Sequence, residues 1–188
     1  MSGRPPLWKI APAARCIREG GVVAYPTEAV YGLGCDPLDP EAVGRLLAIK
    51  GRAEKKGLIL IAANFDQLRP YLGELPPARF KKVRKSWPGP ATWIFPAAPG
   101  TPKWLTGEHG TIAVRVTAHP IAAAQCRSAG MALVSTSANR SGQPPARSAT
   151  EVRRRLGPLL DVVLTGPTGD LKRPTPIRDA RTGATLRK

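Results

Sequence analysis

Hydrophobic and polar positions recur along the chain with two different periods, which predicts strands and helices in turn. Short runs of apolar and β-branched residues predict strands over 22–25, 58–63, 92–95, 112–116, 132–137 and 161–164. Helix-favouring segments lie mostly between these runs, at 11–19, 40–50, 65–72, 78–86, 120–128 and 151–156. Strands separated by helices indicate a layered α/β domain.

The order of these segments also indicates the type of sheet. Asp39 followed by Pro40 is typical of an N-cap and a first helical position. Because no obvious helix separates the strands at 92–95 and 112–116, we expect a mixed parallel and antiparallel sheet. No repeat, linker or composition break divides the chain. We therefore predict one domain over residues 1–188, a twisted mixed sheet flanked by helices.

The net charge of the chain indicates which kinds of partner it binds. Lysine and arginine number 29 against 13 aspartates and glutamates, which gives a formal charge of +16 over 188 residues. A basic excess of this size points to polyanions: nucleic acid, nucleotide phosphates or an acidic membrane surface. Hydrophobic residues make up 42% of the chain, an ordinary globular share that argues against general disorder.

Composition excludes several kinds of site. Three widely spaced cysteines without a CxxC pair indicate neither a disulfide framework nor a zinc site, and two histidines are too few for a three-histidine metal centre. No apolar run approaches the roughly 20 residues that span a bilayer, so no membrane partner is expected. The first ten residues contain Pro5, Pro6 and Lys9 where a signal peptide needs an apolar stretch. We expect a cytoplasmic protein.

The basic residues fall into several groups. The segment 79–85 contains five bases and no acid, and Phe80, Val83 and Trp87 form an apolar stripe that would seat this helix on the core. Its bases, and those of the tail from Leu171, are either plain solvated surface or a contact for an anionic partner.

A second basic group ends the predicted helix at 40–50. In an extended loop Lys50 and Arg52 would point to the same side, with Lys56 four residues further on. A compact ammonium and a planar guanidinium suit adjacent phosphates. The alternative is that these are cations favoured by the negative end of the helix dipole.

Polar residues follow the apolar run at 132–137. At a period of two, Ser135, Ser137 and Asn139 project to one side of a strand. At the carboxyl end of a strand in an open α/β sheet they would line a ligand crevice. The alternative is a polar turn capped by Asn139.

Two other strands carry polar groups that fit the same site. Thr27 follows the strand at 22–25 in a turn fixed by Pro26, which leaves its hydroxyl exposed. Thr111, just before the strand at 112–116, and Arg115 within it point to the same face. A charged arginine in such a strand needs a carboxylate or phosphate partner, or a position at the edge of the sheet. Because neither GxxxxGK[ST] nor a complete dinucleotide fingerprint is present, any nucleotide site is built in another way.

Taken together, these segments resemble the YrdC/TsaC family of threonylcarbamoyl-adenylate synthases. The matching stretches follow the family's order and cover nearly the whole chain: YPTEAVYGLGCDP (25–37), KGRAEKKGLILI (50–61), WPGPATWIFPA (87–97), TIAVRVTAHP (111–120), LVSTSANRSGQPP (133–145) and IRDARTGATLR (177–187). The resemblance implies a YrdC-like mixed sheet around a basic concave cavity, in the short single-domain bacterial form.

The resemblance also implies an activity. The family condenses L-threonine, bicarbonate or CO2 and ATP, with Mg2+ carried by ATP, into L-threonylcarbamoyladenylate and pyrophosphate. No protein side chain is implied as a metal ligand, and no tightly bound organic cofactor. The product supplies the threonylcarbamoyl modification of a tRNA adenosine next to the anticodon, which a partner complex, TsaD with TsaB and TsaE, carries out.

Site residues follow by position from the family's motifs. The tetrad that positions phosphates and supports catalysis corresponds to Lys50, Arg52, Ser137 and Asn139. Threonine-binding positions correspond to Thr27, Arg115, Ser135 and Thr175, and ATP-binding positions to Lys56, Thr111 and Arg187. The chain departs from many relatives at Lys56-Gly57-Leu58, at Ile61, where they have histidine, and at Thr175-Pro176-Ile177.

Two other functions stay open at this point. A double-stranded RNA or tRNA-binding module would use the basic cavity for the phosphate backbone, with an affinity that falls steeply with salt. A carbamoyl- or acyl-phosphate enzyme on the same scaffold is suggested by analogy alone. An enzyme that also touches RNA would combine the first two.

Overall fold

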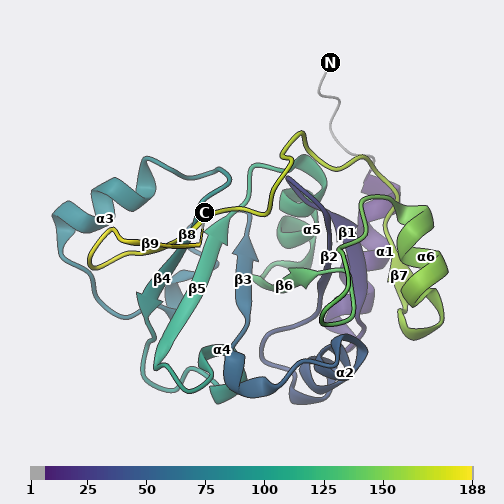
Figure 1. Cartoon of the computed structure of the whole chain (residues 1–188), viewed down its shortest axis with the longest axis horizontal. Helices are drawn as coiled ribbons and strands as arrows, with labels where there is room; N and C mark the ends of the chain where they lie inside the picture. The colour runs from purple at the N-terminus through teal and green to yellow at the C-terminus, as the bar shows by residue number, and fades with distance from the viewer. Residues whose placement is uncertain (1–6, 188) are drawn as a thin grey trace.

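Nine strands form one sheet in the computed structural model of the protein, which describes residues 7–187 (Figure 1). Their order across the sheet is β7-β1-β2-β6-β3-β5-β4-β8-β9. The pairs β1/β7, β3/β5 and β4/β8 are parallel and the other five are antiparallel, which confirms the predicted mixed sheet. The strands are β1 (Val23–Pro26), β2 (Tyr31–Gly34), β3 (Ile59–Ala62), β4 (Thr92–Pro96), β5 (Thr111–Val116), β6 (Leu133–Ser137), β7 (Val162–Val163), β8 (Ile177–Asp179) and β9 (Thr185–Arg187).

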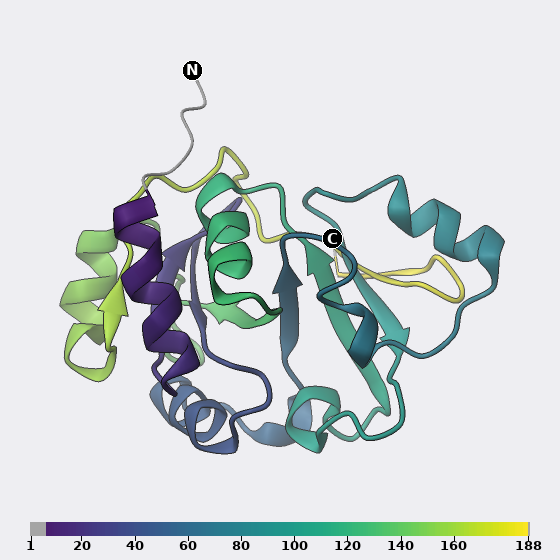
Figure 2. The same ribbon diagram turned by 180° about the vertical axis from the view of Figure 1, so that it is seen from behind.

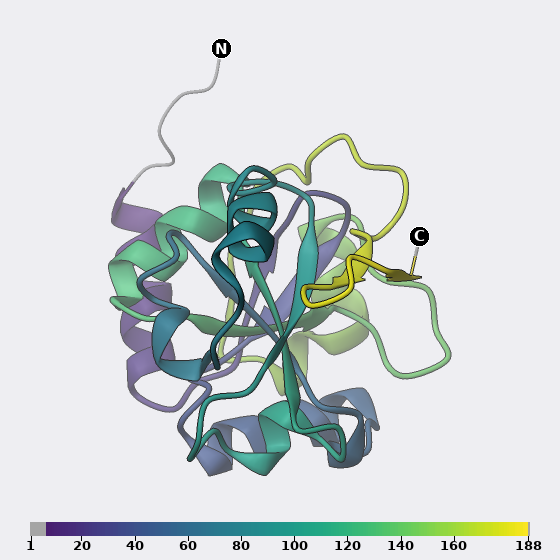
Figure 3. The same cartoon turned by 90° about the vertical axis from the view of Figure 1, so that its left-hand side faces the viewer.

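Helices flank this sheet on its faces and at its ends. The α-helices are α1 (Leu7–Arg18), α2 (Pro40–Lys50), α3 (Pro77–Arg84), α4 (Lys103–Thr106), α5 (Pro120–Ala129) and α6 (Ala149–Leu156). Single 3-10 turns are η1 (Glu54–Lys56), η2 (Arg69–Tyr71) and η3 (Gly157–Leu159). Figure 2 shows α1 and α5 side by side against the sheet, with α6 at one end and α3 beside the β8–β9 hairpin at the other. Figure 3 shows how strongly the strands twist across one another.

Alternating residues of the central strands separate the main core from the floor of a cavity. Leu60 pairs in register with Val114 and Val134, and all three are completely buried in the larger apolar cluster. Their neighbours Ile59 and Ser135 point to the other side and line a cavity. The period of two thus turns one face of β3 and β6 to the main core. The other face lines the cavity at Ile59 and Ser135 and packs in a second apolar cluster at Ile61 and Leu133.

Several predicted boundaries are confirmed. The Asp39 side chain accepts hydrogen bonds from Glu41 N at 2.9 Å and Ala42 N at 3.1 Å, with Pro40 as the first helical residue. The first helix begins earlier than predicted, at Leu7, and includes Pro12. Pro5 and Pro6 lie outside the described residues.

The predicted helix at 65–72 is wrong. That segment makes a hydrogen-bonded turn from Phe65 to Leu68 and then the 3-10 turn η2. Pro70 has no N–H to donate and disfavours helical geometry at the residue before it, so a longer helix cannot form there.

The sequence pattern missed β2 because its residues, Tyr-Gly-Leu-Gly, do not have the composition of a strand. The structure explains the glycine at 34, since a Cβ there would lie 2.5 Å from the Val134 carbonyl oxygen and 2.8 Å from the Tyr25 ring. The one-turn helix α4 and the strands β8 and β9 were also missed. Within residues 7–187 no helix is both long enough and apolar enough to cross a membrane.

Candidate active site

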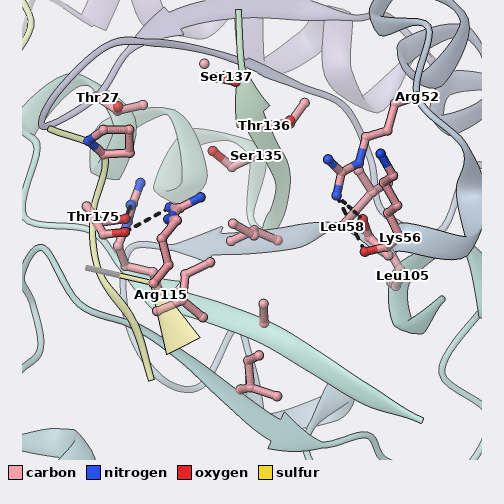
Figure 4. Close-up of a pocket in the computed structure, with 18 of the residues that line it drawn as sticks. Thr27, Arg52, Lys56, Leu58, Leu105, Arg115, Ser135, Thr136, Ser137 and Thr175 are labelled. Atoms are coloured by element: carbon pink, nitrogen blue, oxygen red, sulfur yellow. Dashed lines mark hydrogen bonds between the residues drawn. The ribbon is translucent and has the colours of Figure 1, made fainter. Parts of the chain in front are cut away.

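A cavity of about 400 Å3 lies over the central strands, and its wall is completed by segments far apart in the sequence (Figure 4). Four basic side chains line it: Arg52, Lys56, Arg115 and Arg187. No aspartate or glutamate of the described residues lies in that wall. Its polar lining also includes Tyr31, His109 and the hydroxyl-bearing residues Thr27, Thr106, Thr111, Ser135, Thr136, Ser137 and Thr175. The cavity is therefore basic and suited to anions. The prediction that the Thr27 hydroxyl is exposed is wrong, because it is buried and donates to the Val30 backbone oxygen at 2.7 Å.

The basic groups gather at two ends, which Figure 4 shows on opposite sides of Ser135. We call one the Arg115 end, formed by Glu28, Arg115, Thr175 and Arg187. We call the other the Arg52 end, formed by Lys50, Arg52, Lys56, Ser137 and Asn139. The two ends differ in how their cations are partnered.

At the Arg115 end, the guanidinium of Arg115 is fixed by two neighbours. Its Nη1 donates to Thr175 Oγ1 at 2.7 Å, and its Nη2 lies 3.3 Å from Glu28 Oε2. Arg187 Nη2 donates to the Thr175 backbone oxygen at 2.8 Å, which ties the C-terminal hairpin to the same point. Arg115 Nε is buried without a hydrogen-bond partner.

Glu28 lies behind Arg115 and outside the cavity wall. Its Oε1 accepts hydrogen bonds from Thr117 Oγ1 at 2.7 Å and from Ala118 N at 3.2 Å. Burial opposes ionisation, but the Arg115 charge and the Thr117 hydroxyl hold the pKa of Glu28 below its ordinary value. Glu28 is thus a carboxylate at neutral pH, and it offsets one of the cavity's positive charges.

At the Arg52 end, cations meet neutral oxygens instead. Arg52 Nη2 donates to the Gly57 backbone oxygen at 3.0 Å, and its Nε is buried without a partner. Burial lowers the pKa of Arg52, but a guanidinium stays charged at any physiological pH. Lys56 is exposed at the rim.

Lys50 is the last residue of α2 and is 3% exposed. Its Nζ donates to the backbone oxygens of Ser137 at 2.5 Å and Asn139 at 2.9 Å. Burial, and then the nearby Arg52 charge, lower the pKa of Lys50 to about 8. This lysine supports the end of β6 from behind and does not line the cavity.

The extended loop predicted for residues 50–52 is wrong. Gly51 has φ of 57° and ψ of 45°, the left-handed conformation that ends α2. Lys50 and Arg52 therefore leave the chain in different directions, one beneath β6 and the other into the cavity wall. They remain close enough for their charges to repel.

Asn139 organises the loop after β6. Its Oδ1 accepts a hydrogen bond from Ser137 Oγ at 2.6 Å, and its Nδ2 donates to the Gln143 backbone oxygen at 2.7 Å. Both interpretations of this segment hold in part, because Asn139 forms the turn while Ser135 and Ser137 line the cavity.

The structure brings together nine of the eleven predicted site residues in the cavity wall, and Lys50 and Asn139 lie directly behind it. Thr106, Thr136 and His109 also line the cavity, although the sequence did not indicate them. Thr136 was passed over because strict alternation places it on the other face of β6. His109 lies in a loop with no local signal. Ile61 is fully buried in the second apolar cluster and does not line the cavity.

A family model described as "Telomere recombination", for the Sua5/YciO/YrdC domain, matches residues 15–188. The chain belongs to the Sua5/YciO/YrdC family. Among its relatives in this family, a protein of Alkalilimnicola ehrlichii is 59% identical over 186 residues, covering 97% of this chain and 96% of its own. One of Halorhodospira halophila is 57% identical over 181 residues, with 96% and 95% covered. Both are named threonylcarbamoyl-AMP synthase.

Solved structures of this family agree with the fold. P. abyssi Sua5 complexed with L-threonine superposes with a TM-score of 0.88 at 36% identity. The match covers 94% of this chain but 52% of the Sua5 chain, so this protein spans about half of that relative. E. coli YciO gives a TM-score of 0.86 at 28% identity, covering 98% of this chain and 90% of its own.

Proposed function

We propose that the protein condenses L-threonine, bicarbonate or CO2 and ATP into L-threonylcarbamoyladenylate and pyrophosphate, as a threonylcarbamoyl-AMP synthase. The names of relatives that are 57% and 59% identical over almost the whole chain support this activity. The structural observation that carries it is a cavity with guanidinium groups at both ends, Arg52 and Arg115, and no aspartate or glutamate of the described residues in its wall. Two anion-binding groups at two ends suit a reaction that aligns two anions.

Each end of the cavity has a proposed ligand. Arg115 and Thr175 would hold the threonine carboxylate, with Thr27 and Ser135 beside the threonine. Arg52 would bind the triphosphate, and Lys50 would contribute its charge from behind the Ser137–Asn139 turn. The remaining positions, Lys56, Thr111 and Arg187, would contact the nucleotide, Arg187 from its place beside Thr175 at the Arg115 end.

The chemistry needs alignment more than proton transfer. The threonine amine adds to CO2 and loses a proton to give a carbamate. A carbamate oxygen then attacks the α-phosphorus of ATP, and the bond to the bridging oxygen of pyrophosphate breaks. The site would act by holding the two anions together and neutralising the charge that develops on the leaving pyrophosphate.

The donor set of the cavity bears on the Mg2+ that the reaction uses. Hydroxyl, guanidinium and ammonium groups line the cavity, whereas Mg2+ prefers carboxylate, carbonyl and water oxygens. We therefore place this ion on the ATP phosphates, where it would neutralise part of their charge, and not on protein side chains.

The product implies further partners and a location. We propose that the adenylate is used in the cytoplasm by the TsaD, TsaB and TsaE proteins to modify a tRNA adenosine next to the anticodon. An unstable adenylate must be consumed close to where it is made, so the enzyme and its downstream complex would share a compartment.

One assay tests the activity. Purified protein is given MgATP, bicarbonate and each of several amino acids, and pyrophosphate release and the AMP adduct are measured together. We expect both to depend on threonine and on bicarbonate. Pyrophosphate release that does not respond to threonine would refute the proposal.

A second candidate function, binding of double-stranded RNA or tRNA, is favoured by one observation. The five bases of the segment 79–85 are exposed, and none has an acidic partner within 4.0 Å among the described residues. The tip of the β8–β9 hairpin lies beside them, since a Cβ at Gly183 would be 3.5 Å from Lys82 Nζ. RNA affinity that falls steeply with salt and persists when the cavity is saturated with ATP would support it.

A further inference from the structure

We infer that Glu28 is a positioning residue for threonine: its carboxylate fixes the guanidinium of Arg115 in the orientation that receives the amino acid. The inference rests on the proposed function. Glu28 lies outside the cavity wall, so it would act through Arg115 and not by touching a substrate.

The Glu28 carboxylate is held in one orientation. Oε1 is occupied by the Thr117 hydroxyl at 2.7 Å and the Ala118 N–H at 3.2 Å. Oε2 has no hydrogen-bond partner, and the nearest cation is Arg115 Nη2 at 3.3 Å. The two donors thus hold Oε1, and the second oxygen is left for the guanidinium alone.

The ion pair is also buried. The side chains of Glu28 and Arg115 are 10% and 8% exposed. Little water therefore reaches either side chain, and a guanidinium that lost Glu28 would be free to turn toward other acceptors. A plain surface ion pair would have no such control over orientation.

Glu28 also connects the segments that form the Arg115 end of the cavity. Its backbone oxygen accepts from Leu171 N at 3.1 Å, and the adjacent Thr27 oxygen accepts from Gly169 N at 2.9 Å. These bonds hold the segment that leads to Thr175, the second partner of Arg115. A Cβ at Gly169 would lie 2.7 Å from the Glu28 oxygen, so the segment packs directly on this turn.

Glu28→Gln tests the inference with a nearly isosteric change. Glutamine Oε1 can still accept from Thr117 and Ala118, whereas its NH2 group would face the Arg115 guanidinium as a second donor. We expect the Kd for threonine, measured by calorimetry, to rise about tenfold or more, as loss of a buried charge pair implies, while the Kd for MgATP stays within about twofold. Glu41→Gln, an exposed glutamate of α2, is the matched control.

The outcomes separate this inference from the proposed function. If the wild-type protein binds no threonine, the proposed function fails. If it binds threonine and Glu28→Gln binds it equally well, the inference is wrong. Equal loss of threonine and ATP binding, with a lowered Tm, would mean a structural role only and would also overturn it.

A second variant covers the case in which Glu28→Gln does not fold. Thr117→Val removes the hydroxyl that holds Glu28 Oε1 but keeps the ion pair itself. We expect threonine binding to weaken about threefold, less than in Glu28→Gln, with ATP binding unchanged. Unaltered threonine binding in folded Thr117→Val would contradict the inference.

Discussion

The two ends of the cavity both present cations, but they balance them in opposite ways. At the Arg115 end a buried carboxylate, Glu28, offsets the charge and fixes its direction. At the Arg52 end Lys50 and Arg52 are held only by neutral carbonyl and amide oxygens. The Arg115 end, where Glu28 stands against Arg115 and Arg187, has a fixed geometry and one net positive charge, which suits one carboxylate. The Arg52 end keeps its positive charge, which suits a triphosphate.

The lack of an anionic partner at the Arg52 end has a measurable effect on Lys50. Two cations without an anionic partner repel each other, and the pKa of Lys50 falls to about 8 as a result of burial and of this repulsion. Binding an anion would relieve the repulsion. The cations of the Arg52 end therefore gain an anionic partner only when a ligand binds, whereas Arg115 already has one in Glu28.

The largest expected effect comes from removing charge at the Arg52 end. Lys50→Ala or Arg52→Ala should abolish adenylate formation, lowering pyrophosphate release by at least about 100-fold, because stabilisation of developing phosphate charge is lost. The circular dichroism spectrum should be unchanged. Arg154→Ala, an exposed residue of α6, and Lys85→Ala, exposed after α3, are the matched controls. Near-normal activity of Lys50→Ala or Arg52→Ala would contradict the proposed role of these residues in adenylate formation.

The next effect contrasts the stability of the two ends. Arg115→Ala leaves the Glu28 carboxylate buried and unpaired, which should lower the free energy of unfolding by about 3–5 kcal/mol. Arg52→Ala leaves only carbonyl oxygens behind, at a cost of about 1 kcal/mol. Urea unfolding of both variants measures the difference. Equal losses would show that the ends are not partnered differently.

The pH dependence of ATP binding tests the charge at the Arg52 end. Lys50 must be protonated to attract phosphate, and its pKa is about 8. Above that pH the apparent Kd for ATP should rise by up to about tenfold per unit, since phosphate groups titrate near 6 and stay fully ionised. Residual binding by Lys50→Met should lack this slope. A slope that persists in Lys50→Met would assign the titration to another group.

The smallest effect is expected outside the cavity. Lys81→Ala with Lys82→Ala removes two exposed bases of α3, far from either end along the chain. The KM values for threonine and ATP should stay within about twofold, because exposed charges are screened by solvent and salt. A larger change in either KM, measured in a steady-state assay, would mean that ligand binding at the cavity depends on distant charges. The two ends could then not be distinguished by the partners of their own cations.

The sequence pattern predicted most of the elements, and its failures have local reasons. Pro70 prevents the helix predicted at 65–72. Two glycines disguise β2, and one of them, Gly34, is required because a Cβ there would collide with Val134 and Tyr25. The site residues were indicated by their types and their positions in the family's motifs. Thr136 and His109 gave no usable signal, because neither carries a pattern that local periodicity can detect.

The residue pattern therefore established the mixed α/β class, the basic character and the family of the protein. How the charges are partnered depends on the tertiary structure. Lys50 meets Ser137 across 87 residues, and Glu28 meets Thr117 across 89. Such contacts depend on how strands are ordered in the sheet, which residue spacing does not encode. The periods of 2.0 and 3.6 specify which face a side chain takes but not which segment will lie opposite it.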